Sequence, residues 1–251
     1  TNDISFDIEK GEFAVIVGSS GAGKTTVLKM VNGLIQPTSG DIFVDGENIR
    51  DKNQTQLRRN IGYAIQGSVL FPHMTVEQNI AYVPSLLNKR DKAKTKAAVS
   101  KWMHIVGLPE DLKQRYPFEL SGGQQQRVGI ARALAASPDI LLMDEPFGAV
   151  DEITREQLQT ELKQIHEQTG ITVLFVTHDI SEALKLGTKV LVMNHGKIEQ
   201  FTSPENLLQH PATEFVKKIV KKERRMCHLP EEQLSSCDYS GAGEKGHLDK
   251  E

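Results

Sequence analysis

The stretch GSSGAGKT occupies residues 18–25, directly after the apolar run EFAVIV at residues 12–17. An apolar run that ends at glycine predicts a buried strand, and the residues after the stretch predict a helix. The glycines let the backbone curl so that amide N–H groups face one point, where the helix start adds partial positive charge. A glycine-rich turn with an incidental lysine would lack this flanking strand and helix. The pattern G-x-x-x-x-G-K-[ST] in this setting therefore predicts a phosphate-binding loop, or P-loop.

The P-loop pattern assigns ATP and Mg²⁺ as ligands. Lys24 supplies a positive charge to the β- and γ-phosphates, and Thr25 offers its hydroxyl to Mg²⁺. The predicted ATP-contacting residues of this segment are Gly18, Ser19, Ser20, Gly21, Ala22, Gly23, Lys24, Thr25 and Thr26.

Two further apolar runs end at polar residues that suit hydrolysis. Residues 140–143 stop at Asp144, which Glu145 follows, and residues 172–176 lead into His178. Such runs, separated by helical stretches, indicate an α/β domain with a mostly parallel sheet that binds ligands at the carboxyl ends of its strands. We expect Asp144 to hold Mg²⁺ and Glu145 to accept a proton from an attacking water, although a charged strand end facing solvent is the alternative. For His178, position alone leaves a structural and a functional role equally open.

Residues 120–124 read LSGGQ and are followed by QQR. This segment resembles the signature motif of ABC transporter ATP-binding proteins, and the resemblance runs from residue 1 to about 220 with the motifs in order. It implies that His178 is the switch histidine and that Gln66 is the Q-loop glutamine, with catalytic and metal-binding roles. It also implies a head-to-tail dimer in which the signature motif contacts ATP on the partner's P-loop. The further ATP-contacting residues that it implies are Ser121, Gly122, Gly123, Gln124 and, in the D-loop, Asp151.

The same resemblance sets the expected organisation of the chain. We expect an ABC-type P-loop NTPase domain over residues 1–221, with a mostly parallel core sheet and a small antiparallel β part. A helical subdomain over about residues 67–136 carries the signature motif. Residues 222–251 lose the apolar period and predict a flexible polar tail. In the family, an aromatic residue that stacks on adenine lies upstream of Asn2, so no residue of this numbering is assigned to that role.

Local patterns predict several individual elements. Residues 4–8 predict a strand. Residues 91–106 predict a core-facing helix with Asp91 as its N-cap. Residues 152–168 predict a second helix that stops at Gly170.

The stretches around the motifs resemble those of importers. Residues 66–76, the YPFE segment at 116–119 and the run EPFGAVDEITR at 145–155 are similar to ATPases that energise glycine betaine, carnitine and choline import. We therefore expect transmembrane permease subunits and, indirectly, a solute-binding protein as partners, with the chain peripheral on the cytoplasmic face of the membrane. The D-loop reads Gly-Ala-Val-Asp where many ABC proteins have Ser-Ala-Leu-Asp. Some relatives carry paired regulatory CBS modules, for which 222–251 is too short.

Two alternatives remain open at this point. The solute could be another one, such as an amino acid, because the solute never meets this subunit. A soluble ABC ATPase of translation or DNA repair is disfavoured, because such proteins usually fuse two ATPase units or carry a long coiled-coil insertion.

Composition limits the remaining classes. The net charge of -3 argues against a nucleic-acid partner, and no run approaches the roughly 20 apolar residues that span a bilayer. The chain opens with no secretion signal. Cys227 and Cys237 fit free thiols in a reducing compartment better than a zinc site with His228 and His247.

Overall fold

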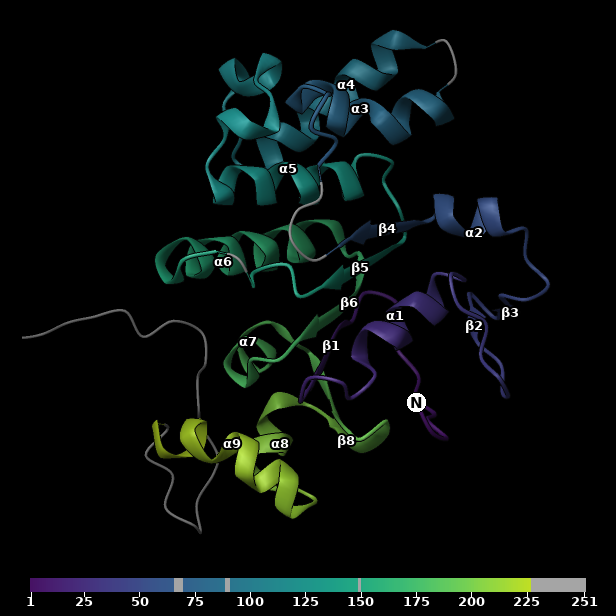
Figure 1. Ribbon diagram of the computed structural model, residues 1–251, viewed down its shortest axis with the longest axis vertical. Helices are drawn as coiled ribbons and strands as arrows, with labels where there is room; N and C mark the ends of the chain where they lie inside the picture. Colours follow the sequence, from purple (N-terminus) through teal and green to yellow (C-terminus); the bar gives the residue numbers. More distant parts are fainter. Residues whose placement is uncertain (66–69, 89–90, 149, 227–251) are drawn as a thin grey trace, which may run out of the picture.

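The computed structural model describes residues 1–65, 70–88, 91–148 and 150–226 (Figure 1). Within these residues, a six-stranded sheet has the order β4-β5-β6-β1-β7-β8, and a separate two-stranded sheet pairs β2 with β3. In the six-stranded sheet, neighbouring strands from β4 to β7 pair in parallel, and the edge strand β8 pairs antiparallel with β7. The strands are β1 Phe13–Gly18, β2 Phe43–Val44, β3 Glu47–Asn48, β4 Ile61–Ala64, β5 Ile140–Asp144, β6 Thr172–Thr177, β7 Lys189–Asn194 and β8 Lys197–Thr202. The expected α/β class, with a mostly parallel sheet and a small antiparallel part, is confirmed.

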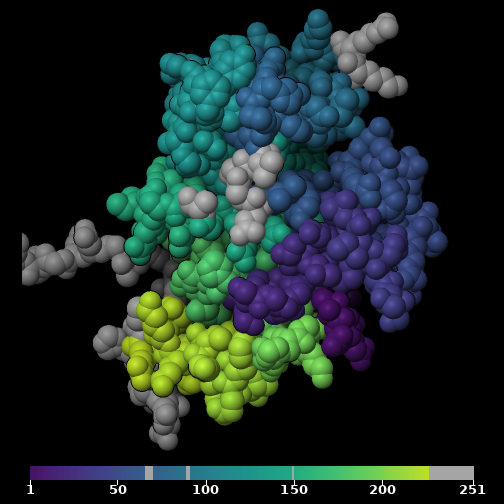
Figure 2. Space-filling model, viewed as in Figure 1, coloured from purple at the N-terminus to yellow at the C-terminus, as the bar shows by residue number. Residues whose placement is uncertain are grey.

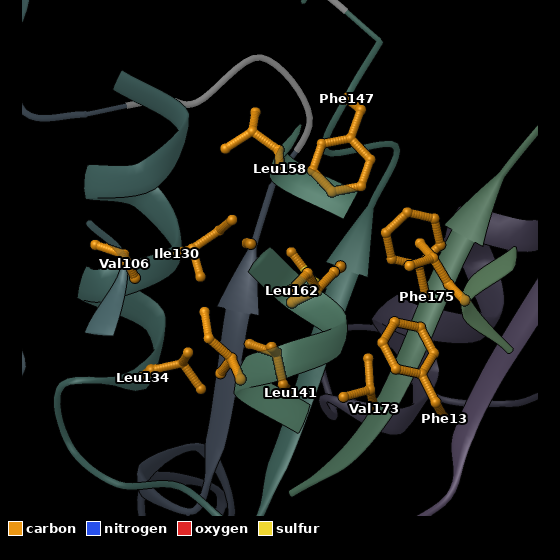
Figure 3. Packing of buried hydrophobic residues seen from close by; sticks show 14 of the residues in the cluster. Phe13, Val106, Ile130, Leu134, Leu141, Phe147, Leu158, Leu162, Val173 and Phe175 are labelled. Atoms are coloured by element: carbon orange, nitrogen blue, oxygen red, sulfur yellow. The ribbon is translucent and has the colours of Figure 1, made fainter. Parts of the chain in front are cut away.

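Alternating side chains of β1 feed two hydrophobic cores, one on each face of the sheet. Ala14 and Ile16 pack with α1 (Lys24–Val31) and α2 (Gln54–Arg59). Phe13 and Val15 pack with α6 (Glu152–Thr169) and α7 (Ile180–Leu186). Figure 3 shows the second core, where Leu158 and Leu162 of α6 lie between the sheet and α5 (Gly122–Leu134). Because both faces of the sheet are covered, β1 is buried along its whole length.

The helical subdomain forms one end of the molecule. It contains α3 (Val76–Leu87), α4 (Lys92–Ile105), two short 3₁₀ turns (Glu110–Gln114 and Pro117–Glu119) and α5 (Figure 1). Helices α8 (Pro204–Gln209) and α9 (Glu214–Met226) lie at the opposite end, as the teal and yellow regions of Figure 2 show.

Both helices expected from local patterns are confirmed. Helix α4 begins after Asp91, whose side chain accepts a hydrogen bond from the Lys94 amide. Helix α6 ends at Gly170, which adopts a left-handed conformation with φ of 63°. The described part of the chain contains no helix that is both long and apolar enough to cross a bilayer.

One sequence-based expectation was wrong. Residues 4–8 form no strand, and Ile4, Phe6 and Ile8 instead pack half-buried against the core that contains α1. The alternating pattern there reflects packing on one side rather than pairing with a neighbouring strand. Helix α9 extends to Met226, and Glu223 takes the next buried position of its inner face after Val220. Residues 227–251, including both cysteines, lie outside the described residues.

Candidate functional site

The glycines of the P-loop are required by its backbone. Gly18 ends β1 against β7, and a Cβ atom there would lie 2.0 Å from the Met193 carbonyl oxygen. Gly21 and Gly23 have φ of 78° and 96°, a backbone conformation that residues other than glycine rarely adopt. Gly23 immediately precedes α1, so the start of this helix lies at the end of the loop. The strand, loop and helix therefore have the geometry that gathers amide donors for a phosphate.

The Lys24 side chain folds back across the loop. Its Nζ atom donates to the Gly18 carbonyl at 2.8 Å and to the Ser19 carbonyl at 3.0 Å. Burial lowers the pKa of Lys24, while Glu145 and Asp144 act in the opposite direction. The ammonium group can make three hydrogen bonds, so one donor remains for an anion. Of the other predicted contacts, Ser19, Ser20 and Gly21 are exposed, Thr26 is half-buried and Ala22 is buried.

A hydroxyl and a carboxylate meet beside the P-loop. Thr25, in the first turn of α1, donates from Oγ1 to Asp144 Oδ1 at 2.9 Å. Burial at the end of β5 raises the pKa of Asp144, and the hydrogen bond from Thr25 opposes this shift. Two adjacent hard oxygen atoms are the donor type that Mg²⁺ prefers, and the pair thus fits a magnesium ion. Within the described residues, no group of three or more His, Cys, Asp and Glu side chains forms a metal site.

Glu145 and His178 come together from the ends of adjacent strands. The pairing of Asp144 with Val176 brings the two ends level, and the Glu145 amide donates to the Val176 carbonyl at 2.9 Å. His178 Nδ1 lies 3.3 Å from Glu145 Oε2. Glu145 has φ of 43°, a left-handed conformation that is uncommon outside glycine and often marks functional sites. The structure thus brings the imidazole of His178 to the carboxylate of Glu145, the residue directly after Asp144.

The signature residues lie at the start of α5. Ser121 Oγ accepts from the Gln124 amide at 3.3 Å, and Gln124 Oε1 accepts from the Ser121 amide at 2.9 Å. Gly122 has open space where a Cβ atom would stand, whereas a Cβ on Gly123 would lie 2.6 Å from Thr154 Cγ2. Among the described residues, no hydrogen bond joins Ser121 to residues 18–25 of its own chain.

The remaining predicted site residues lie apart from this pair. Asp151 caps α6, with Oδ1 accepting from the Thr154 amide at 3.0 Å, and this bond is the main cause that lowers the pKa of Asp151. Gln66 lies outside the described residues.

Sequence reasoning missed two networks beside the site. Glu182 is buried and accepts hydrogen bonds from Thr177 and Gln159. Arg127 of α5 forms a two-bond ion pair with Glu161 of α6, at 2.7 and 3.0 Å. The acidic residue four positions after His178 was the available signal for the first network. Both networks join helices that are distant in sequence, so local patterns could not pair them.

These features define a P-loop nucleotide-binding domain with a carboxylate and a histidine at the strand ends beside the loop. The chain belongs to the ABC transporter family, whose model matches residues 1–148.

The chain is similar to several curated ATP-binding proteins. It is 50% identical over 230 residues to the glycine betaine/carnitine/choline transport ATP-binding protein OpuCA of Bacillus subtilis, covering 92% of this chain and 60% of that protein. It is 49% identical over 218 residues to the glycine betaine uptake system ATP-binding protein YehX of Escherichia coli, covering 87% and 70% respectively. The chain thus spans about 60% of the length of OpuCA.

Solved structures agree with the fold. The dimeric post-hydrolysis structure of the ATP-binding cassette MJ0796, bound to ADP and Pi, has a TM-score of 0.70 at 34% identity and covers 79% of this chain and 88% of its own. The structure of cbiO1 from Clostridium perfringens, part of the ABC transporter complex cbiONQ, has a TM-score of 0.77 at 27% identity and covers 90% and 91%.

Proposed function

We propose that this protein binds and hydrolyses ATP to drive an ABC importer for quaternary-ammonium osmoprotectants such as glycine betaine, carnitine and choline. The observation that carries the hydrolytic part is the pair of Glu145 and His178, 3.3 Å apart at the strand ends beside the P-loop. The solute class is supported by the 48–50% identity to osmoprotectant ATP-binding proteins over 87–92% of the chain.

Each side chain of the site has a task in this reaction. Lys24 and the loop amides hold the β- and γ-phosphates and offset their charge. Thr25 and Asp144 would hold Mg²⁺, which neutralises charge that develops on the phosphate oxygens. Glu145 accepts a proton from the attacking water, as its position directly after Asp144 allows. His178 orients the Glu145 carboxylate through Nδ1 and offers its other ring nitrogen to the γ-phosphate. Gln66, by resemblance, contributes to the metal and the water.

The second half of each ATP site would come from another subunit. Ser121 is exposed, heads α5 and has no hydrogen bond to its own P-loop. Its helix start can meet a γ-phosphate on a partner, and Gly122, Gly123, Gln124 and Asp151 would lie at the same face. Permease subunits and a solute-binding protein complete the assembly, with this chain at the cytoplasmic face of the membrane.

A second solute class remains as an alternative. The chain is also 44% identical to the sulfate/thiosulfate import ATP-binding protein CysA of Synechococcus elongatus, so much of the sequence is shared by importers of unlike solutes. An amino-acid importer is the nearest such alternative in chemistry, since glycine betaine is itself an N-methylated amino acid.

Uptake measurements test the proposal. Deleting the gene should lower uptake of labelled glycine betaine, carnitine or choline into cells at high osmolarity. The unchanged protein should restore uptake, and Glu145→Gln should not. Unchanged quaternary-amine uptake together with lost amino-acid uptake would favour the alternative, and loss of neither would refute an import role.

A further inference from the structure

The exposed ring of His178 depends on its backbone for orientation. Its side chain is 60% exposed, so packing contributes little to holding it opposite Glu145. The turn formed by residues 177–179 therefore decides where the ring lies. Whatever fixes this turn also fixes the contact between Nδ1 and the carboxylate.

The buried carboxylate of Glu182 fixes that turn. The Thr177 hydroxyl donates to Glu182 Oε2 at 2.6 Å and accepts from the Asp179 amide at 3.0 Å. Thr177 and Glu182 are only 2% and 6% exposed, so water does not compete for these bonds. The residues on both sides of His178 are thus bonded into one network that ends on Glu182.

The other oxygen of Glu182 reaches helix α6. Gln159, which is also buried, donates from Nε2 to Glu182 Oε1 at 3.1 Å. One turn earlier on the same helix, Arg155 donates to the Val150 carbonyl at 3.0 Å, directly before Asp151. Arg155 and Glu182 also line one small pocket with Glu145 and His178. Glu182 thus joins the turn that carries His178 to helix α6 through Gln159, and Arg155 lies near Glu182 at the start of that helix.

Burying this carboxylate has a cost. Burial is the largest cause that raises the pKa of Glu182, and hydrogen bonds from Thr177 and Gln159 only partly oppose it. A neutral glutamine would fill the same space without that cost. The structure therefore requires at position 182 a side chain with two polar atoms, one for Thr177 and one for Gln159, rather than the negative charge itself.

We propose that Glu182 is a positioning residue for ATP hydrolysis, which holds the 177–179 turn so that His178 meets Glu145, and which ties this turn to α6 through Gln159. The inference rests on the proposed function. Glu182 touches no reacting atom, and its effect on the reaction passes through Thr177 to His178.

A double-mutant cycle tests this role. Glu182→Ala and Thr177→Val should each lower kcat by about 10–100-fold, the usual effect of removing a group that orients a functional side chain. The KM for ATP should stay within about twofold, since the P-loop is untouched. The double variant should lose no more than either single variant, because both changes break the same link. Ring ¹⁵N NMR shifts of His178 should also change in both variants, which a purely stabilising role would not cause.

Two matched variants separate positioning from folding. Glu182→Gln can accept from Gln159 and donate to Thr177 Oγ1, so it should keep kcat within about threefold. Lys185→Ala removes a charge from the last turn of the same helix and should leave kcat unchanged. Additive losses in the cycle, an equal loss in the Gln and Ala variants, or unchanged His178 shifts in Glu182→Ala would each overturn the proposal. If the unaltered protein hydrolysed no ATP, the proposed function would fail, and the NMR shifts would still report on the positioning of His178.

Discussion

At the scale of single residues, Glu145 stands out because its backbone is strained and its side chain has a partner. A φ of 43° in a non-glycine residue costs roughly 1 kcal/mol or more of conformational energy. Such backbone strain persists only where the surrounding structure enforces it, and it is concentrated at functional sites. In this conformation the Glu145 carboxylate lies 3.3 Å from Nδ1 of His178.

The first prediction concerns Glu145. Glu145→Gln keeps the size and hydrogen-bonding of the side chain but removes the proton acceptor, so kcat for ATP should fall by about a hundredfold or more. ATP binding, measured by equilibrium titration, should remain. Glu167→Gln removes an exposed carboxylate from the far end of α6 and serves as the control. Near-normal turnover by Glu145→Gln would remove Glu145 from this role.

The second prediction concerns Glu182 and pH. Its folded-state pKa is raised from the ordinary value of 4.5 by burial, with Asp179 adding to the shift and Arg155 opposing it. Such a group stabilises the fold below about pH 4.5, and this contribution is lost as the pH rises through the folded-state pKa. Glu182→Gln should therefore raise the thermal midpoint at pH 7.5 by about 2–4 °C, the shift that about 1 kcal/mol gives in a chain of this size.

The gain from Glu182→Gln should shrink as the pH is lowered toward 4.5, where the native carboxyl group is protonated as well. Thermal unfolding of both proteins at a series of pH values measures this difference in thermal midpoint. A constant gain across the series would show that the charge of Glu182 is not its cause.

At the scale of secondary-structure elements, helix α6 joins two parts of the site. Its Glu161 forms an ion pair with Arg127 of α5, and its Thr154 lies close to Gly123 of α5. Toward α7 it meets Glu182 through Gln159. Any rotation of α5 relative to the sheet must therefore break a partly buried ion pair or move α6.

The third prediction concerns the contact between α5 and α6. In Gly123→Ala, the new methyl group would lie 2.6 Å from Thr154 Cγ2, so the protein should lose about 1–3 kcal/mol of stability. Gly122→Ala meets open space and should gain about 0.5–1 kcal/mol, as alanine does in a helix. Denaturant unfolding compares the two variants.

Removing the opposing methyl group should restore the fit. The double variant Gly123→Ala/Thr154→Ser lacks Cγ2 and should regain most of the lost stability. Equal effects of alanine at positions 122 and 123 would contradict the close approach of the two helices.

The elements that the sequence predicted well are those whose signals are local. The strand ends at Asp144 and before His178 follow from apolar runs, and the limits of α4 and α6 follow from Asp91 and Gly170. The strand predicted at residues 4–8 is absent, because an alternating pattern indicates which side of a segment is buried and not whether a neighbouring strand is available to pair with it.

The parts of the site that the sequence could not predict depend on tertiary packing. The bonds of Glu182 to Thr177 and Gln159 depend on how α6 and α7 pack on β6, and residue spacing carries no record of this. Glu223 of α9 is a related case, because a charged residue there fills a buried position of the helix.

At the scale of the whole molecule, the P-loop and the signature motif of one chain act at different ATP sites if the dimer is head-to-tail. Lys24 is bonded within the P-loop, and the hydrogen bonds of Ser121 among the described residues go to Gln124 and Gln125 at the start of its own helix. Figure 1 places α1 beside the core sheet and α5 in the helical subdomain. Two chains related by a two-fold axis would bring each Ser121 to the partner's P-loop.

The fourth prediction tests this arrangement by mixing variants. Lys24→Ala removes the phosphate-binding charge, and Ser121→Arg blocks the signature motif, so each variant alone should form dimers with no intact site. In a one-to-one mixture about half of the dimers contain one chain of each kind, and each of these has one intact site and one site with both lesions. If the two sites turn over independently, the mixture should regain about a quarter of the unaltered ATPase rate. Mixing Lys24→Ala with the double variant Lys24→Ala/Ser121→Arg leaves no intact P-loop and should regain nothing. If the first mixture also regains nothing while mass spectrometry detects the mixed dimers, Ser121 does not act on the partner's ATP and the head-to-tail assignment is wrong.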